Sequence, residues 1–270
     1  MAQSYALITG ATSGMGYEFA RQLAAKHHNI IVVSNQRDRN EEVAAELSAE
    51  YGVEAMPLYA DLSQVGSAEA IYNHCQSNNV EVDILISNAG MLHFAYLDAT
   101  SCSTIERFNT LHCTVPMMLC RLFGADMSKR RNGYILIVSS VTAWTPYPTM
   151  SLYGSTKASL KSFAQSLWYE YHQLGVGVTC IYPGAVDTPL YDLNQKQRKI
   201  LHRVGLMMHA DTVVRRALRR MFNKRRTYIP GFITKIIVLL CKILPAHAIL
   251  LVMKIPAARR VLDDRKQPQN

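Results

Sequence analysis

A tyrosine and a lysine four residues apart, Tyr153 and Lys157 in the segment "YGSTK", are the side chains of this sequence best suited to acid–base chemistry. The surrounding pattern predicts a helix over residues 151–174, and residues four apart on a helix project from the same face. A phenol has an ordinary pKa of about 10, and a neighbouring ammonium group lowers that pKa by favouring the phenolate. Tyr153 could then act as a general acid towards a ketone or as a general base towards an alcohol.

The first predicted strand ends in "TGATSGMG", where Gly10, Gly14 and Gly16 lead into a predicted helix. Glycines at such a turn let a pyrophosphate approach the backbone. The amino terminus of the helix then offers free N–H groups and the positive end of the helix dipole to phosphate. A glycine pattern alone could mark a structural turn, but its position between the first strand and the first helix favours dinucleotide binding.

Short apolar runs alternate with longer helical patterns along the chain, which indicates a parallel sheet covered by helices on both faces. We therefore expect an α/β protein with a Rossmann-like, doubly wound parallel sheet. A single dinucleotide-binding catalytic domain should cover residues 1–230, and a C-terminal amphipathic helical tail should cover residues 231–270. The predicted strands are 5–9, 29–34, 54–60, 82–87, 133–140, 175–183 and an edge strand at 227–231, and the predicted helices include 14–27, 40–51, 66–78 and 151–174.

Four further segments follow the glycine turn in order: "NAG" at 88–90, "SS" at 139–140, "YGSTK" at 153–157 and "PGAVDT" at 183–188. Together with the turn, their order and spacing resemble the short-chain dehydrogenase/reductase family over residues 4 to about 230. The resemblance implies that Tyr153 exchanges a proton with the substrate and that Lys157 also holds the nicotinamide ribose. It further implies that Ser140 hydrogen-bonds the substrate carbonyl, since Ser139 fits the family spacing less well.

The resemblance also implies a set of cofactor contacts. Asp61 in "YADLS" is similar to the family aspartate beside the adenine, and Thr188 is similar to the threonine that binds the carboxamide. Asn88 and Gly90 are similar to the pair at a strand end that supports the cofactor. The full expected set is Gly10, Thr12, Ser13, Gly14, Gly16, Asn35, Arg37, Asp61, Leu62, Asn88, Gly90, Tyr153, Lys157, Pro183, Gly184, Val186 and Thr188.

One position departs from the family pattern. The family asparagine, which anchors a water in a proton path from the lysine, falls by its spacing on His112 in "NTLHCTVPMMLCR". Asn109, three residues away, is the alternative. A histidine could hold that water, although it would titrate near neutral pH. A buried histidine with purely structural partners is an equally good interpretation.

The end of the second predicted strand bears on the identity of the cofactor. An acidic side chain at this place binds the ribose hydroxyls and repels a 2′-phosphate. Positions 34–36 are instead Ser, Asn and Gln, and Arg37 follows directly. We therefore expect NADP(H) as the preferred cofactor, with NAD(H) possible because Asp38 lies nearby. We expect no metal ion.

Apolar side chains should surround the substrate. Residues 141–152 and the segment from Leu190 to His209, expected as a mobile lid, should flank the pocket. Adaptable aromatic and methionine side chains suit such walls. The candidates are Trp144, Tyr147, Met150 and Tyr191, with Met207 and Met208 in addition.

These observations predict an NADP(H)-dependent oxidoreductase that reduces a ketone on an apolar substrate with Tyr153 as the general acid. The substrate would be a 3-oxo lipid, a long-chain base similar to ketosphinganine, or a steroid. The alternative is a nucleotide-binding regulatory or scaffold protein that keeps the fold without turnover. The intact trio of Ser140, Tyr153 and Lys157 disfavours that alternative.

The charge of +9 is concentrated, because residues 213–226 carry seven of the 29 basic residues and no acidic one. A solvated helix face and attraction to anionic lipid both explain this segment. Nucleic acid is disfavoured because no aromatic residues interleave with the arginines. The apolar segment 231–256 predicts two short amphipathic helices broken at Pro245, with Lys235 and Lys242 on one stripe of the first. At about 15–20 Å each, neither would span a hydrocarbon core of about 30 Å.

The remaining expectations concern location and assembly. The six cysteines form no C-x-x-C pair, and the first strand begins within five residues of the N-terminus, so we expect reduced thiols and a cytoplasmic protein. The apolar tail suits either peripheral contact with an anionic membrane surface, which we favour, or a lid against the domain that covers the pocket. By its resemblance the chain should form a homodimer or homotetramer through the two long helices on either side of "GYILIVSS".

Overall fold

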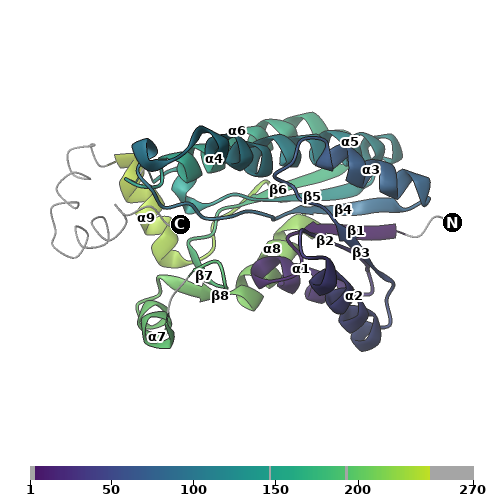
Figure 1. The fold of residues 1–270 in the computed structure, drawn as a ribbon, viewed down its shortest axis with the longest axis horizontal. Coiled ribbons are helices and arrows are strands. Elements are labelled where there is room, and N and C mark those ends of the chain that lie inside the picture. Colours follow the sequence, from purple (N-terminus) through teal and green to yellow (C-terminus); the bar gives the residue numbers. More distant parts are fainter. Residues whose placement is uncertain (1–3, 146, 192–193, 244–270) are drawn as a thin grey trace.

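The computed structural model describes residues 4–145, 147–191 and 194–243. At its centre lies a sheet of seven parallel strands in the order β3–β2–β1–β4–β5–β6–β9 (Figure 1). The strands expected from the sequence are all present, with ends that differ by three residues or fewer. They are β1 (Ser4–Thr9), β2 (Asn29–Ser34), β3 (Ala55–Tyr59), β4 (Glu81–Ser87), β5 (Gly133–Val138), β6 (Val176–Ile181) and β9 (Thr227–Tyr228).

The order of the strands creates the crevice that a ligand needs. β1 pairs with β2 on one side and with β4 on the other. The chain therefore winds outwards to β3, returns across β1, and continues in the opposite direction from β4. The connections that follow β1 and β4 run to opposite faces of the sheet. Between them, the carboxyl ends of these two strands border a crevice. This topology confirms the doubly wound sheet.

Helices cover both faces of the sheet (Figure 1). Each layer buries its own apolar cluster against the sheet, with side chains such as Phe19 and Leu47 in one cluster and Leu119 and Leu160 in the other. Burial on both faces explains why the central strands are apolar at successive positions. One layer holds α1 (Gly14–Ala24), α2 (Arg37–Tyr51) and α8 (Ala210–Phe222), and the other holds α3 (Ser67–Ser77), α4 (Cys102–Asn109), α5 (Val115–Arg130) and α6 (Ser151–His172).

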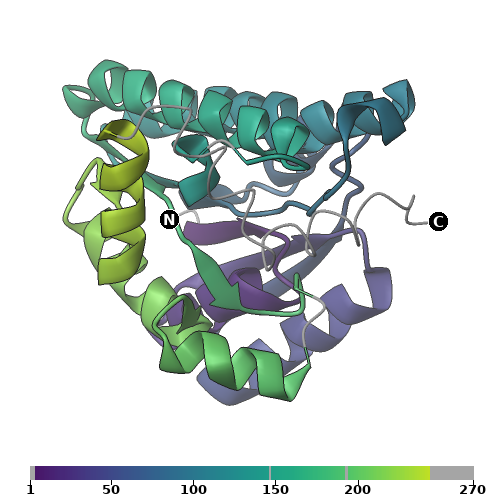
Figure 2. The same cartoon turned by 90° about the vertical axis from the view of Figure 1, so that its left-hand side faces the viewer.

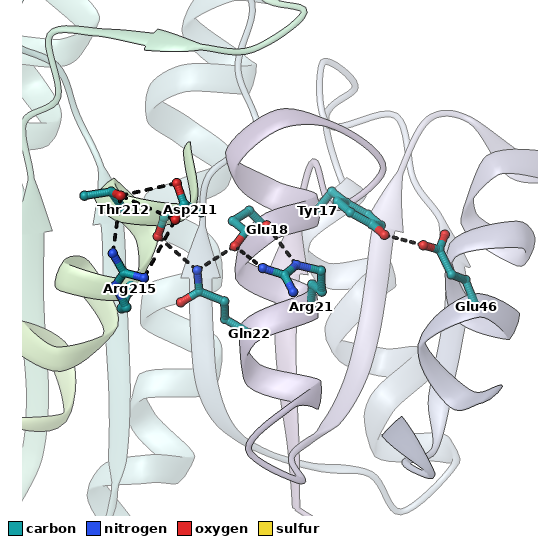
Figure 3. Close-up of polar contacts among 8 residues, drawn as sticks. All are labelled: Tyr17, Glu18, Arg21, Gln22, Glu46, Asp211, Thr212 and Arg215. Carbon is teal, nitrogen blue, oxygen red and sulfur yellow. Dashed lines mark hydrogen bonds and ion pairs between the residues drawn. The ribbon is translucent and has the colours of Figure 1, made fainter. Parts of the chain in front are cut away.

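Polar contacts fasten α8 to α1 at the rim of the first layer. Figure 3 shows the Gln22 side chain of α1 donating to the backbone carbonyl of Asp211 (3.0 Å) and to Glu18 (2.5 Å). The Asp211 carboxylate in turn pairs with Arg215 at 3.7 Å. These bonds join the first helix of the chain to a helix almost 190 residues later in the sequence.

The C-terminal part adds features that the sequence pattern did not predict. A second, two-stranded parallel sheet joins β7 (Ala185–Asp187) to β8 (Met207–His209), and α7 (Gln195–Arg203) lies between them in the chain. These strands are three residues long, too short for a hydrophobic period to be detected.

The expected first helix of the tail is present as α9 (Phe232–Ile243). In Figures 1 and 2 it stands at one end of the sheet, drawn in yellow-green. The expected second helix, with Pro245, His247 and Lys254, lies outside the described residues. Within the described ranges, no helix is both long and apolar enough to cross a membrane.

Candidate active site

The turn between β1 and α1 is shaped so that its backbone can meet a ligand. Gly10 and Gly14 adopt positive φ angles of 67° and 54°, which residues with a side chain rarely take. A Cβ atom on Gly16 would lie 1.9 Å from the Gly10 carbonyl oxygen, and one on Gly10 would lie 3.0 Å from Ala89 Cα. The turn must therefore stay bare. A loop without side chains at the amino terminus of a helix lets a pyrophosphate group reach the backbone N–H groups.

Asn88 fixes this turn from the neighbouring strand. Its side chain donates to the Thr9 carbonyl (3.0 Å), while its backbone N–H donates to the Thr9 hydroxyl (2.9 Å). The ends of β1 and β4 are thereby tied together at the mouth of the crevice. This arrangement agrees with a supporting role for Asn88 rather than a reactive one.

A cavity of about 430 Å³ opens at this edge of the sheet. All but two of the residues expected at the cofactor line it. Gly16 lies behind the turn, where it contacts Gly10 and Asn88, and Arg37 lies outside the lining with its guanidinium 4.9 Å from the centre of the Tyr59 ring. The lining residues of the expected set are Gly10, Thr12, Ser13, Gly14, Asn35, Asp61, Leu62, Asn88, Gly90, Tyr153, Lys157, Pro183, Gly184, Val186 and Thr188.

Ser140, Tyr153 and Lys157 meet in the wall of this cavity. Ser140 follows β5, and its side chain is hydrogen-bonded with that of Tyr153 on α6. One turn further along α6, the Lys157 ammonium donates to the Val138 carbonyl at 3.1 Å and stands 5.5 Å from the centre of the Tyr153 ring. The Ser140 side chain thus meets those of Tyr153 and Lys157, because the end of β5 lies next to α6.

The neighbouring Ser139 has a structural role. Its hydroxyl donates to the Lys157 carbonyl at 2.8 Å, and its backbone N–H donates to the Ile181 carbonyl at 2.9 Å. With these bonds Ser139 fastens α6 to the end of β5. Between the two serines, the geometry brings Ser140 to Tyr153.

Burial dominates the protonation of the tyrosine and the lysine. Burial raises the pKa of Tyr153, Tyr191 raises it further, and the hydrogen bond with Ser140 opposes the increase. The sequence predicted a lowered pKa for Tyr153, but in the folded chain the net shift of this pKa is upward, because the effect of burial exceeds the lowering effects. Burial also lowers the pKa of Lys157 to about 8.

His112 lies in the site, whereas Asn109 does not. A π-helical turn over Thr110–Thr114 separates α4 from α5 and carries His112 inwards, 5.7 Å from Tyr153 between ring centres. Asn109 stays exposed and donates to the Ile105 carbonyl one turn back in α4. π-helical turns are rare and cluster at functional sites.

Both ring nitrogens of His112 are occupied by protein groups. Nε2 accepts the Met91 N–H at 3.0 Å, so the neutral ring carries its proton on Nδ1 and donates to the Thr156 hydroxyl at 3.2 Å. Burial, with a smaller effect of the Lys157 charge, lowers the His112 pKa to about 2. The expectations that His112 would hold a water through its ring and titrate near neutrality are therefore wrong. It is a neutral bridge between the strand end after β4 and α6.

The end of the cavity where the adenine was expected is lined by Asp61 and by an unexpected arginine, Arg107. The Ser63 hydroxyl donates to the Asp61 carboxylate at 2.7 Å and lowers the pKa of that carboxyl, and Arg107 contributes to the lowering. Arg107 also lines the cavity, although it belongs to α4. Arg107 could not be predicted from the sequence, because no local pattern relates a residue of α4 to the end of β3.

Only some of the residues expected around the substrate line the cavity. Tyr191 lines the cavity, whereas Trp144 is not among its lining residues and packs against Tyr182 at 4.3 Å between ring centres. Tyr147 and Met150 are not among the lining residues either, since they lie in the turns that lead into α6. Met207, the first residue of β8, is buried. Further apolar lining residues that the sequence did not predict include Met91, Leu111 and Pro189, with Leu190 beside Tyr191.

The segment after Thr188 is anchored beside the cavity by an acidic residue of β7. Asp187 accepts hydrogen bonds from Arg198 and from His202 (2.9 Å), both on α7, and these bonds lower its pKa. Arg198 also donates to the Tyr191 carbonyl at 2.8 Å. Possible ligand atoms of Asp187, His202 and His209 lie within 4.8 Å of one another.

Comparison with known proteins agrees with this geometry. A mouse 17-beta-hydroxysteroid dehydrogenase type 3 is 30% identical over 200 residues, which cover 72% of this chain and 64% of the relative. A very-long-chain 3-oxoacyl-CoA reductase of Anas platyrhynchos is 28% identical over 198 residues, 71% of this chain and 62% of the relative. This chain thus spans less than two thirds of the length of these relatives.

A solved structure is similar to this chain over its full length. A short-chain dehydrogenase from Sphingobium yanoikuyae in complex with NADPH is 27% identical and superposes with a TM-score of 0.74, covering 100% of this chain and 98% of that one. Residues 4–199 of this chain match the sequence profile of the short chain dehydrogenases. The protein belongs to the short-chain dehydrogenase family of oxidoreductases.

Proposed function

We propose that the protein is an NADP(H)-dependent reductase of a ketone on an apolar substrate. The observation that carries the proposal is the buried Tyr153 hydroxyl, hydrogen-bonded with Ser140 and facing the same cavity as the bare glycine turn. When bound, NADPH supplies a hydride from C4 of its nicotinamide. A proton donor and a phosphate cradle in one cavity are what such a reduction requires.

The chain's own residues then handle the substrate oxygen. Ser140 donates a hydrogen bond to the carbonyl oxygen and places it next to the Tyr153 hydroxyl, which gives up its proton as negative charge develops. The Lys157 ammonium stabilises the phenolate that remains. His112 is a positioning residue, because it joins Met91 to Thr156, and the Thr156 hydroxyl donates to the Tyr153 carbonyl at 2.9 Å.

The substrate class follows from the cavity wall and from the relatives. Leu111, Leu190 and Tyr191 give an apolar surface to the cavity that Tyr153 also lines. The relatives described above are named for a hydroxysteroid and for a very-long-chain 3-oxoacyl-CoA. We favour a 3-oxo lipid, a long-chain base similar to ketosphinganine, or a steroid. We also propose a homodimer or homotetramer assembled through α5 and α6.

A panel of ketones tests the proposal. NADPH oxidation followed by absorbance should be fastest with 3-oxo lipids, long-chain 3-ketones or steroids, and slow with short soluble ketones. The competing function is a nucleotide-binding regulatory or scaffold protein. Tight NADPH binding without oxidation by any ketone of the panel would support that function and reject ours.

A cofactor prediction concerns Arg37, which begins α2 directly after the cavity-lining residues Asn35 and Gln36. If it turns from the Tyr59 ring to a 2′-phosphate, Arg37→Ala should weaken NADPH binding about tenfold or more, the effect of losing a charge-assisted hydrogen bond. NADH binding should barely change. Arg39→Ala is the matched control, because Arg39 on the same helix pairs with Glu42. Equal losses for both cofactors would show that Arg37 is structural.

The pH dependence of reduction should reflect Lys157. Because burial lowers its pKa to about 8, the ammonium is present below that pH and is lost as the pH rises through it. We expect kcat/KM for ketone reduction to fall above about pH 8, by up to tenfold per pH unit. Lys161→Met should keep the same profile, since Lys161 lies over Trp144. A profile that stays flat to about pH 10 would contradict this role.

A further inference from the structure

A strongly basic groove lies between α8 and α9, outside the active site. No acidic residue lines it among the described residues. The nearest acid on α8, Asp211, is already paired with Arg215. The groove therefore holds an unbalanced positive charge that would attract an anion. Its cationic lining consists of Arg216, Arg219, Arg220, Arg225 and Lys235.

The helix on the other side of this groove exposes its apolar face. α9 packs on the domain through a narrow stripe in which Thr234 and Val238 are buried. The opposite face carries large apolar side chains at helical spacing, and Phe232 and Ile243 at its two ends are 78% and 68% exposed. This exposed stripe consists of Phe232, Ile236, Leu239, Leu240 and Ile243. A contiguous apolar surface beside a cationic one is typical of an interfacial helix.

We propose that the α8–α9 surface binds an anionic lipid bilayer. In this arrangement the exposed stripe of α9 enters the boundary between headgroups and acyl chains, and the arginines of the groove hold lipid phosphates. Lys235 belongs to α9 and lines the groove, so the cationic and apolar surfaces adjoin. Both contributions are needed, because basic side chains attract the anionic surface and the apolar side chains anchor the helix.

Charge argues against the other occupants of this surface. A second copy of the chain, paired symmetrically, would bring the same cations against one another. Residues 244–270 of this chain carry five basic and two acidic residues, so they would not neutralise the groove. Nucleic acid would match the charge but would leave the apolar stripe of α9 without a partner. An anionic bilayer matches both surfaces.

The position of α9 connects this surface to the active site. Thr234 lies against Gly184, a residue of the cavity wall, since a Cβ on Gly184 would be 3.0 Å from the Thr234 hydroxyl. Bilayer contact would hold the cavity wall close to the membrane. The inference itself does not depend on the proposed reaction, because binding is measured without turnover.

The first experiment is co-sedimentation of the full chain with vesicles. The protein should sediment with phosphatidylglycerol vesicles at low salt and much less with phosphatidylcholine vesicles. In about 1 M salt, where the screening length falls to about 3 Å, binding should weaken strongly. Recovery in the supernatant with anionic vesicles at low salt would overturn the proposal, and so would equal binding to both lipids.

Variants then separate the two surfaces. Each basic residue near an anionic surface is worth about fivefold in partitioning, so Arg216→Gln with Arg219→Gln should weaken it roughly 25-fold. Phe232→Ser should weaken it at least about tenfold through lost apolar burial. The matched controls are Arg39→Gln with Lys129→Gln, and Val65→Ser, which change exposed residues elsewhere. Equal losses in the controls would overturn the proposal.

Two further measurements exclude a folding defect and a different anion. NADPH affinity and the thermal midpoint of each variant should match the wild-type values, which shows that lost vesicle binding is local. Inorganic phosphate or double-stranded DNA, added at low salt, should compete weakly with vesicles. If DNA binds the wild-type chain tightly while Phe232→Ser has no effect on vesicle binding, the surface is a polyanion site and the bilayer assignment fails.

Discussion

Tyr153→Phe should lower kcat for NADPH-dependent ketone reduction by about 10²–10⁴-fold, the usual contribution of a positioned general acid. The substitution removes only the hydroxyl that is hydrogen-bonded with Ser140. The ring should keep its packing against Phe108 and His112, at 6.4 and 5.7 Å between ring centres. The measurement is NADPH absorbance with the best ketone of the panel, together with NADPH affinity by fluorescence.

The affinity for NADPH separates the chemical role of the hydroxyl from a packing role. It should stay within a few-fold of wild type in Tyr153→Phe, because the glycine turn is untouched. Tyr147→Phe is the matched control, since Tyr147 is outside the cavity and exposed, and it should keep full activity. A Tyr153→Phe protein that kept more than about a tenth of the wild-type kcat would exclude Tyr153 as the proton donor.

Gly16→Ala should be the most damaging single-methyl change in the cofactor cradle. The new Cβ would lie 1.9 Å from the Gly10 carbonyl oxygen and 2.6 Å from Asn88 Nδ2, so α1 and the turn cannot both keep their positions. Overpacking of this kind costs up to about 3 kcal/mol, which corresponds to a hundredfold or so in NADPH affinity if the turn yields. If α1 yields, the cost appears as a lower free energy of unfolding.

The experiment for Gly16→Ala measures NADPH binding and urea unfolding on one preparation. Gly154→Ala is the matched control, because Gly154 is helical and its added Cβ would meet only the Thr142 carbonyl at an ordinary 3.5 Å. That control should be neutral, or more stable by up to about 1 kcal/mol from helix propensity. A Gly16→Ala protein with normal stability and normal NADPH affinity would show that the turn is not the phosphate cradle.

Several features of the molecule followed from the sequence alone. The strands were predictable because burial on both faces demands unbroken apolar runs, and the glycine turn because close backbone approach excludes side chains. Tyr153 and Lys157 could be paired because helical spacing places them on one face. In each case the feature depends either on contacts between residues close in the sequence or on a burial pattern that all central strands share.

Other features depended on contacts between distant parts of the chain. His112 becomes a neutral bridge only because a π-helical turn brings it between Met91 and Thr156. Trp144 resembles a pocket residue in the sequence, yet it packs on Tyr182, which arrives from the end of β6. No local pattern specifies such partners, since each pairing joins positions about 20 to 45 residues apart.

The protonation of the site was also decided by tertiary structure. From the sequence, the lysine charge was expected to lower the tyrosine pKa, whereas in the folded chain burial raises it and lowers that of Lys157. The effect of desolvation on a pKa depends on how many segments of the chain bury the group. The spacing of two residues in the sequence does not determine that number. For α9, likewise, the sequence predicted an amphipathic helix, but only the fold decided that Thr234 and Val238 face the domain. The broad apolar face was thereby left outside, because a helix can bury only the stripe that its neighbours reach.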